Sequence, residues 1–285
     1  MVKIIRFRIM GEEDLGILVD GYIAPFKEME LPPYIEYPLS RESMTMETLK
    51  NLRPEDYLVY DIEEVDILPP IKYPGKIICL GLNYKSHVLE TGREMPSDIV
   101  IFMKPRTSVA GPYDIIEVPK IVKQLDYEGE MAIVIGRRGR FIGVDEAYNY
   151  ILGYMIMNDL SARDYQFSDG QWTRGKGFDG FAPIGPWIVT LDEIGDPHKL
   201  RIRTWVNDEL RQDGSTSEMI FKIPEIVSRI SMVMTLEPGD IISTGTPAGV
   251  GFVHGEDKLL KDGDKVRIEI EGIGFIENTI RFIDV

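Results

Sequence analysis

Cysteine is nearly absent from this sequence, and long apolar runs are missing. The one cysteine, Cys79, lies in the apolar run 77–80, so no intrachain disulfide can form and its side chain is expected to pack as a small hydrophobic group. No stretch approaches the roughly 18 consecutive apolar residues of a membrane span. Arg6 and Arg8 interrupt the apolar start of the chain, which therefore lacks the core of a signal peptide. These features predict a cytoplasmic protein without a membrane partner.

Basic residues are scarce relative to acidic ones. The 285 residues include 32 Lys and Arg against 47 Asp and Glu, a formal net charge of −15. A chain this acidic repels phosphate backbones and carries no basic stripe, so nucleic acid is not expected as a partner. Small organic acids are not excluded, because a metal ion or a few Lys and Arg side chains can reverse the field inside one pocket.

Several catalytic motifs are missing as well. The sequence has no H-E-x-x-H, no Cys/His cluster and no G-x-S-x-G. The residues needed for a zinc site or for a serine catalytic triad are therefore missing. Residues 170–177 fit the start of a phosphate-binding loop, but Gly177 stands where that loop needs a hydroxyl for Mg²⁺, and no buried strand precedes it. Nucleotide binding is therefore rejected. Lys176, on a glycine-flanked turn, could still reach a substrate carboxylate or enolate.

The residues that are present predict a mixed β fold of the α+β class. Short apolar or alternating runs between turns dominate and helical stretches are few, which disfavours a doubly wound parallel sheet. We expect a mainly antiparallel assembly, folded into a roll or a distorted sandwich. Strands are expected at 76–82, 131–136, 150–157, 187–190, 200–207, 240–244 and 265–271. Helices are expected at 84–90, just after residue 159, and at 224–235.

A boundary is predicted near residue 71. Three prolines and a glycine within 67–75 prevent a continuous helix or a central strand there. Before this point, 2–25 predicts strands around the turn 11–14, and 43–52 predicts a short helix. The chain is therefore divided into a small strand-rich N-terminal domain, 1–71, and a larger domain, 72–285.

Two glutamates begin a strand that is apolar on both faces. Because side chains alternate along a strand, Glu128 and Glu130 point to the same side. Like charges on a buried strand repel each other, and a divalent cation such as Mg²⁺, Mn²⁺ or Ca²⁺ removes that conflict. The alternative is a solvated strand start. Asp159, where the next apolar strand ends, is either a helix N-cap or a third ligand.

Two further pairs have helical spacing. Asn83 can cap a helix on which His87 and Glu90 lie one turn apart, an arrangement that suits a general base near neutral pH. His198 and His254 lie in polar turns without such a partner, so His87 is favoured as the functional histidine. Arg163 and Gln166, spaced i, i+3, could bind a carboxylate together or simply form a solvated helix face.

Taken in order, these segments resemble the fumarylacetoacetate hydrolase family over roughly 72–285. Each piece is short, but eight in the same order are specific. The pieces are N-Y-x-x-H-x-x-E at 83–90, F-M-K-P at 102–105, E-x-E at 128–130, N-D-x-S-A-R-D-x-Q at 158–166, K-G-F-D at 176–179, P-I-G-P-W at 183–187, the stretch 207–221 and T-G-T-P-A-G-V-G at 244–251. One departure is Gly180, where some members carry a hydroxyl residue.

The resemblance implies a β-roll catalytic domain, usually dimeric, that acts on 2-oxo acids and their enols. We therefore expect a homodimer with a small-molecule 2-oxo acid as its partner. The implied ligands of Mg²⁺, or of Mn²⁺ or Ca²⁺, are Glu128, Glu130 and Asp159. The implied catalytic residues are His87 and Glu90 on a lid, together with Lys176. The implied substrate-binding residues are Lys104, Arg163, Gln166 and Thr246.

One metal site of this kind can serve three reactions. Hydrolysis of a C–C bond in an acylpyruvate is favoured here, because His87 and Glu90 form the pair that water activation needs. Decarboxylation of oxaloacetate or isomerisation of a hydroxyheptadienedioate would pass through a similar enolate. An alternative from another functional class is a catalytically silent metal- or ligand-binding protein. Loss of a site carboxylate would favour this alternative. All three carboxylates are intact.

Overall fold

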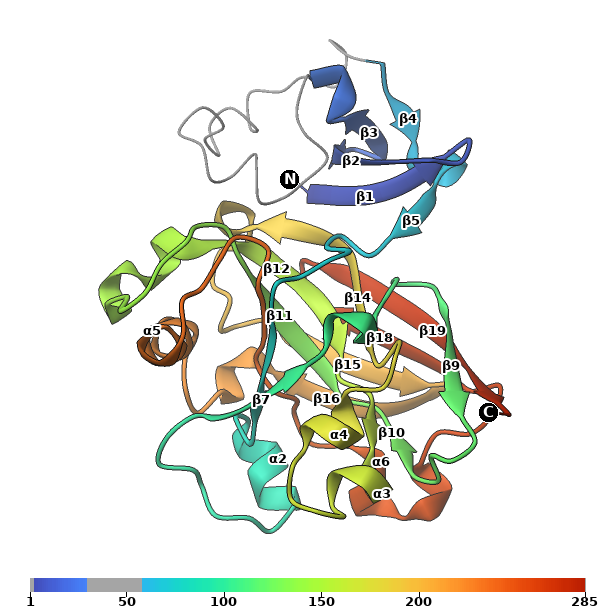
Figure 1. Cartoon of the computed structure of the whole chain (residues 1–285), viewed down its shortest axis with the longest axis vertical. Helices are drawn as coiled ribbons and strands as arrows, with labels where there is room; N and C mark the ends of the chain where they lie inside the picture. The colour runs from blue at the N-terminus through green and yellow to red at the C-terminus, as the bar shows by residue number, and fades with distance from the viewer. Residues whose placement is uncertain (1–2, 30–57, 285) are drawn as a thin grey trace.

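The computed structural model describes residues 3–29 and 58–284, and it is built mainly from strands (Figure 1). The helix predicted at 43–52 lies outside the described residues. The expectation of a mixed, mainly antiparallel β fold is confirmed. Among the described residues, parallel pairing occurs between β17 and β6, β14 and β8, and β19 and β9.

The largest sheet has twelve strands, ordered β4-β3-β2-β1-β14-β12-β11-β17-β6-β7, with β5 beside β1 and β8 beside β14. Its N-terminal strands are β1 (Lys3–Ile9), β2 (Glu12–Val19), β3 (Tyr22–Pro25), β4 (Tyr60–Asp61) and β5 (Asp66–Leu68). The others are β6 (Ile77–Gly81), β7 (Val100–Lys104), β8 (Val109–Ala110), β11 (Gly129–Ile135), β12 (Ile151–Asn158), β14 (Ala182–Thr190) and β17 (Ile241–Ser243).

A five-stranded sheet packs against one face of the large sheet. Its order is β16-β15-β18-β19-β9, and a two-stranded sheet pairs β10 with β13. The bounds are β9 (Ile115–Pro119), β10 (Leu125–Asp126), β13 (Ser161–Ala162), β15 (Arg201–Val206), β16 (Glu209–Ser215), β18 (Lys265–Ile270) and β19 (Gly274–Ile283). The main core lies between the two larger sheets and unites Ile133 and Tyr154 of the large sheet with Ile202, Ile268 and Ile276 of the other.

Strand β11 is buried on both faces, as its continuous apolar sequence predicts. Ile133 and Ile135 join the main core, whereas Ala132 and Val134 join a second core on the opposite face of the sheet. A strand enclosed in this way is a rigid support for groups placed at its start. Glu128 and Glu130 lie at that start.

Short helices gather at the end of the molecule opposite the N-terminal strands (Figure 1). They are α2 (Lys85–Glu90), α3 (Arg163–Gln166), α4 (Thr173–Lys176) and α6 (Gly251–His254). The longer α5 (Ile223–Val233) covers another part of the structure and buries Ile223, Ile226, Val227 and Ile230, one face of an amphipathic helix. Helix α4 corrects the sequence interpretation of a glycine-flanked turn around Lys176.

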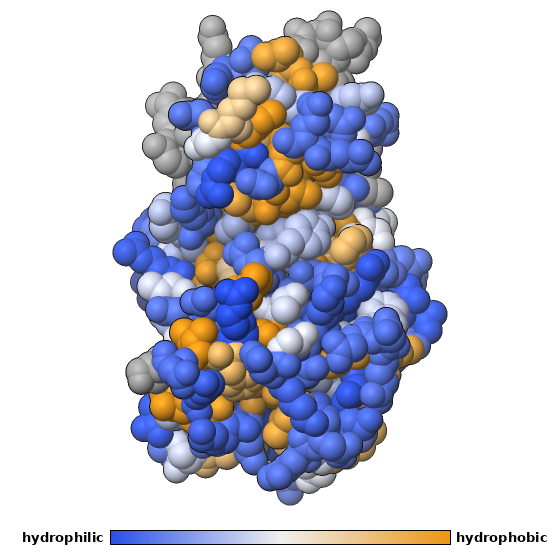
Figure 2. Space-filling model, turned by 90° about the vertical axis from the view of Figure 1, so that its right-hand side faces the viewer, coloured by the Kyte–Doolittle hydropathy of each residue, from blue (hydrophilic) through white to orange (hydrophobic). Residues whose placement is uncertain are grey.

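The N-terminal strands extend the sheet that carries the site. Strand β1 pairs with β14 through Lys3 opposite Val189 and Ile4 opposite Ile188. The strands predicted within 2–25 are confirmed, but the turn predicted at 11–14 is wrong, because β2 already begins at Glu12. The boundary near residue 71 remains a prediction. Figure 2 shows a face whose lower part is mostly hydrophilic, with hydrophobic residues gathered over the N-terminal strands. No helix in the described ranges is long and apolar enough to cross a bilayer.

Strand β14 is longer than its sequence predicts. It begins at Ala182, five residues before the expected start, and continues through Pro183 and Pro186. Proline lacks the N–H that a regular ladder requires. The register of β14 against β12 shifts between the pairs Tyr154–Val189 and Ile156–Gly185, so the irregularity lies within residues 186–188, which include Pro186.

Candidate active site

Two neighbouring strands bring three carboxylates together. Glu128 directly precedes β11 and Asp159 directly follows β12, and the pairing of Gly129 with Asn158 places them side by side. The backbone N–H of Asp159 donates to the Glu128 carbonyl at 2.9 Å. One ligand atom from each of Glu128, Glu130 and Asp159 lies within 4.8 Å of the others, and all three residues are buried. A solvated strand start is therefore the wrong interpretation.

Asp159 does not cap a helix. Helix α3 begins at Arg163 after Ala162, and no side chain caps it. The Asp159 carboxylate instead accepts from two buried lysines, Lys104 Nζ at 2.5 Å and Lys176 Nζ at 2.8 Å. Lys176 Nζ also donates to Glu128 Oε2 at 2.6 Å. The N-cap alternative is therefore wrong, and Asp159 belongs to the charged cluster.

Arg163 holds Glu128 from the other side. Its Nη2 lies 2.7 Å from Glu128 Oε1. The same guanidinium donates to Asp126 Oδ2 through Nε at 2.9 Å and to Gln166 Oε1 through Nη1 at 2.8 Å. Arg163 and Gln166 are buried, so the solvated helix face considered for this pair is wrong. The sequence interpretation did not assign Asp126, although it lies two residues before Glu128.

The cluster is short of positive charge. Four buried carboxylates, Asp126 with the triad, face Lys104, Arg163 and Lys176, which leaves one negative charge uncompensated. Burial would raise the pKa of Glu128, but Lys176 and Arg163 outweigh it and hold that pKa below its usual range. Burial, followed by Asp159 and Glu128, raises the pKa of Glu130 well above its usual range.

Glu130 is the carboxylate of the triad whose negative charge a bound cation would neutralise. Its Oε2 accepts from the Ser243 hydroxyl and, at 3.0 Å, from the Gly245 N–H, both neutral donors. Three carboxylate oxygen donors with one uncompensated negative charge are the ligand set that hard divalent cations prefer. The residues present therefore fit a divalent metal ion.

His87 and Glu90 form the predicted pair on α2. His87 Nδ1 and Glu90 Oε1 lie 3.0 Å apart, and both side chains are largely buried. Glu90 Oε2 also accepts from the Gly249 N–H at 2.9 Å. His254 Nε2 lies 3.5 Å from the same oxygen, so the interpretation that His254 lacks a glutamate partner is wrong.

The asparagine before α2 does not cap it. Helix α2 has Tyr84 at its N-cap, without a side-chain hydrogen bond. The Asn83 amide instead donates to the Thr244 carbonyl at 2.8 Å and accepts from the Phe221 N–H at 2.9 Å. Asn83 therefore ties the strand before α2 to two distant loops rather than starting the helix.

The pocket that contains this cluster is small and partly aromatic. Its polar lining includes His87, Glu128, Glu130, Arg163, Gln166, Lys176 and Thr246. Its other lining residues include Gly81, Arg93, Phe102, Phe167, Trp172 and Phe252. Of the predicted site residues, Glu90, Lys104 and Asp159 do not line this pocket. The sequence patterns gave no signal for Arg93 or Trp172.

Two residues predicted to bind substrate have partners within the protein. Lys104 Nζ donates to the Leu160 carbonyl at 3.0 Å as well as to Asp159, and its side chain is fully buried. The Thr246 hydroxyl donates to the Gly129 carbonyl at 3.0 Å and accepts from Gln212 Nε2 at 2.8 Å. Thr246 still lines the pocket. Substrate contact by either residue remains a prediction.

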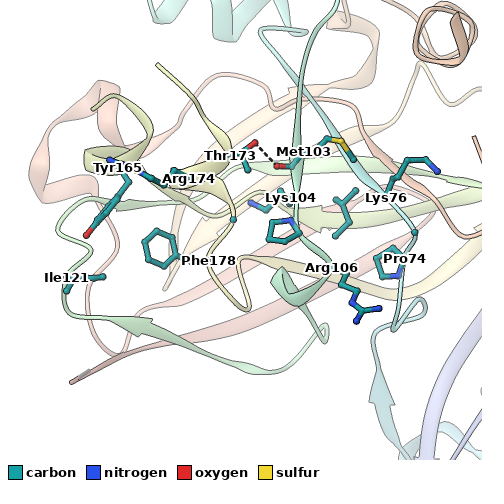
Figure 3. Close-up of a pocket in the computed structure, with 14 residues that line it drawn as sticks. Pro74, Lys76, Met103, Lys104, Arg106, Ile121, Tyr165, Thr173, Arg174 and Phe178 are labelled. Carbon is teal, nitrogen blue, oxygen red and sulfur yellow. Dashed lines mark hydrogen bonds between the residues drawn. The ribbon is translucent and has the colours of Figure 1, made fainter. Parts of the chain in front are cut away.

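A larger and more open hollow is lined in part by Met103 and Lys104 of β7. Its volume is about 720 Å³, and its lining is mainly apolar. Figure 3 shows Tyr165, Phe178 and Ile121 along one side, with Thr173 hydrogen bonded to Met103. It contains none of the three carboxylates. Its size therefore does not identify the catalytic pocket.

Comparison with known proteins agrees with the site. The family model for the fumarylacetoacetate (FAA) hydrolase C-terminal domain matches residues 76–281. The Bacillus subtilis (strain 168) protein named oxaloacetate tautomerase YisK is 45% identical over 235 residues, which cover 80% of this chain and 78% of that protein.

Solved structures agree over nearly the whole chain. A 2-hydroxyhepta-2,4-diene-1,7-dioate isomerase from Mycobacterium marinum has a TM-score of 0.80 at 38% identity, covering 99% of both chains. A maleylpyruvate hydrolase from Sphingobium sp. SYK-6, solved with manganese(II) and pyruvate, has a TM-score of 0.82 at 28% identity, covering 98% of this chain and 99% of that one. With the matched domain spanning the acidic triad, this chain belongs to the fumarylacetoacetate hydrolase family.

Proposed function

We propose that the protein is a divalent-metal-dependent tautomerase that interconverts the enol and keto forms of a 2-oxo acid, with oxaloacetate as the first candidate substrate. The observation that carries this proposal is the buried acidic triad, of which Glu128 and Glu130 line one pocket together with His87 of the His87–Glu90 pair. The similarity to a protein named oxaloacetate tautomerase, at 45% identity, supports the choice of reaction.

The metal would be held by Glu128, Glu130 and Asp159, with Mg²⁺ or Mn²⁺ as the candidate ions. When bound, it would supply positive charge that stabilises the negative charge developing beside the ketone. Lys176 and Arg163 hold Glu128 from two sides and so fix the direction of its carboxylate. Because Glu128 is buried and paired, its carboxylate is already oriented before an anionic substrate enters.

His87 is the proposed acid–base group. The Glu90 carboxylate accepts a hydrogen bond from Nδ1–H, which leaves Nε2 as the nitrogen that can exchange a proton with substrate. Tautomerisation moves one proton between the enol oxygen and C3 and breaks no C–C bond. A single imidazole can take that proton from one atom and return it to the other. The Gly249 N–H on Glu90 Oε2 keeps the carboxylate aligned with the ring.

Hydrolysis of an acylpyruvate is the second candidate. The same pair could activate water, and the similar Sphingobium structure is titled a maleylpyruvate hydrolase. The two reactions differ in outcome, since hydrolysis cleaves the carbon chain and tautomerisation does not.

A substrate panel tests the proposal. The purified protein with Mn²⁺ is mixed with oxaloacetate enol, acetopyruvate, fumarylpyruvate and a hydroxyheptadienedioate, and ultraviolet absorbance and products are followed. We expect loss of the oxaloacetate enol signal faster than in buffer, with the carbon chain intact, and abolished by chelator and by His87→Gln. Cleavage of an acylpyruvate without enol turnover would favour the second candidate. An oxaloacetate rate equal to that in buffer would refute the first.

A further inference from the structure

The pocket has one permanent cation with no carboxylate partner. Among the described residues, Arg93, Arg163 and Lys176 are the Lys and Arg side chains that line it. Arg163 is bound to Asp126 and Glu128, and Lys176 is bound to Glu128 and Asp159. Within 3–29 and 58–284, Arg93 forms no ion pair.

Arg93 rests on an aromatic wall. Its guanidinium lies 5.9 Å from the centre of the Trp172 ring, within the range of a cation–π contact. Trp172 meets Phe102 edge-on, with ring centres 5.5 Å apart. At Gly81 the ring approaches so closely that a Cβ would lie 2.1 Å from it. The wall therefore depends on the absence of a side chain at Gly81, and it holds the free cation beside the pocket.

The position of Arg93 at the exposed side of the pocket gives it a distinct task. Lys176 and Arg163 are already paired with carboxylates of the protein, around the triad where the 2-oxo group would bind. A substrate with a second carboxylate would place that group away from the triad. Guanidinium is well suited to bind a carboxylate with two parallel hydrogen bonds. Arg93 is exposed enough to make such bonds without losing an existing ion pair.

We propose that Arg93, backed by Trp172, is the specificity residue that binds the distal carboxylate of a four-carbon dicarboxylic 2-oxo acid and so selects diacids over monoacids. This inference rests on the 2-oxo acid chemistry of the proposed function. It adds the residue that determines the substrate class, which the triad and the His87–Glu90 pair do not set.

Binding of matched, unreactive ligands tests this selection. L-malate and L-2-hydroxybutanoate have the same length and the same 2-hydroxy acid end, and differ in a terminal carboxylate against a methyl group. Neither can enolise. Their dissociation constants are measured by calorimetry on the full chain with Mn²⁺, for the unsubstituted protein, Arg93→Gln and Arg93→Lys. Arg138→Gln is the matched control, since Arg138 is an exposed arginine, 73% accessible, outside this pocket.

We expect the unsubstituted protein and Arg138→Gln to prefer L-malate by about tenfold or more. Arg93→Gln should reduce this preference to about twofold or less, and Arg93→Lys should keep part of it, because a lysine retains the charge without the fork of donors. No preference in the unsubstituted protein, or an unchanged preference in Arg93→Gln, would overturn the inference. If the preference depends on Arg93 but oxaloacetate enol is not turned over, the inference stands and the proposed reaction fails.

Discussion

Replacing Asp159 and Glu130 of the triad by amides, one at a time, should have different effects on the stability of the metal-free protein. Asp159 accepts from two fully buried lysines, Lys104 and Lys176. Asp159→Asn removes that charge and turns an amide donor toward an ammonium group. Breaking a buried ion pair on one side costs about 3–5 kcal/mol. At roughly 2–4 °C per kcal/mol for a chain of this size, the melting temperature should fall by about 6–20 °C.

Glu130→Gln should reduce the stability of the metal-free protein little, if at all, compared with Asp159→Asn. Glu130 has no ion pair among the described residues, and its Oε2 accepts from Ser243 and Gly245, which a glutamine oxygen can also satisfy. The substitution also removes the one uncompensated charge of the cluster. We therefore expect a melting temperature in chelator equal to or above that of the unsubstituted protein.

Thermal unfolding with chelator and with Mn²⁺ separates these contributions. A bound ion at about 100 times its dissociation constant stabilises the native state by about 2.7 kcal/mol. The unsubstituted protein should show this gain, and both variants should lose it. Equal destabilisation of the two variants in chelator would refute the charge assignment. A full gain from Mn²⁺ in either variant would refute its role as a ligand.

Three further predictions concern single residues. His87→Gln should lower kcat by about 10²–10⁴-fold while leaving Mn²⁺ affinity by calorimetry unchanged, and full turnover would place the base elsewhere. Gly81→Ala should displace Trp172, destabilise the fold by about 1–3 kcal/mol and alter tryptophan fluorescence, whereas an unchanged spectrum and melting temperature would contradict the close packing. Burial lowers the pKa of His198, whose Nε2 accepts from the Ile223 N–H at 3.1 Å. The unfolded chain then binds more protons, so this contribution to stability is present above about pH 6.5 and is lost as pH falls below it. His198→Gln should flatten that part of the profile in chemical denaturation, and an unchanged slope would exclude His198 as its source.

Local geometry predicted only part of the acidic triad. Strand alternation puts Glu128 and Glu130 on one side, whereas the position of Asp159 at a strand end left an N-cap and a third ligand equally open, and the family resemblance favoured the ligand. The His87–Glu90 pair follows in the same way from helical spacing. In each case the relevant contacts lie within one element or between adjacent strands.

Contacts between distant segments were not predictable from the pattern. Lys104 lies 55 residues from Asp159, and His254 lies far along the chain from Glu90, so neither pairing leaves a local signal. The neutralisation of Arg163 by Asp126 is of the same kind, at a separation of 37 residues.

The extent of β14 was missed for a different reason. Pro183 and Pro186 are typical of strand ends, yet the strand continues through them by shifting its register. Tertiary pairing with its neighbours outweighs the local preference against strand at these two residues.

The central claim is that Glu128, Glu130 and Asp159 bind one divalent cation. Anomalous diffraction from crystals grown with Mn²⁺ tests it most directly. We predict a single strong peak within coordination distance of one oxygen from each carboxylate, with Lys176 Nζ displaced or sharing its present partners. A fully occupied Mn²⁺ peak elsewhere, or none at the triad at saturating Mn²⁺, would contradict the account.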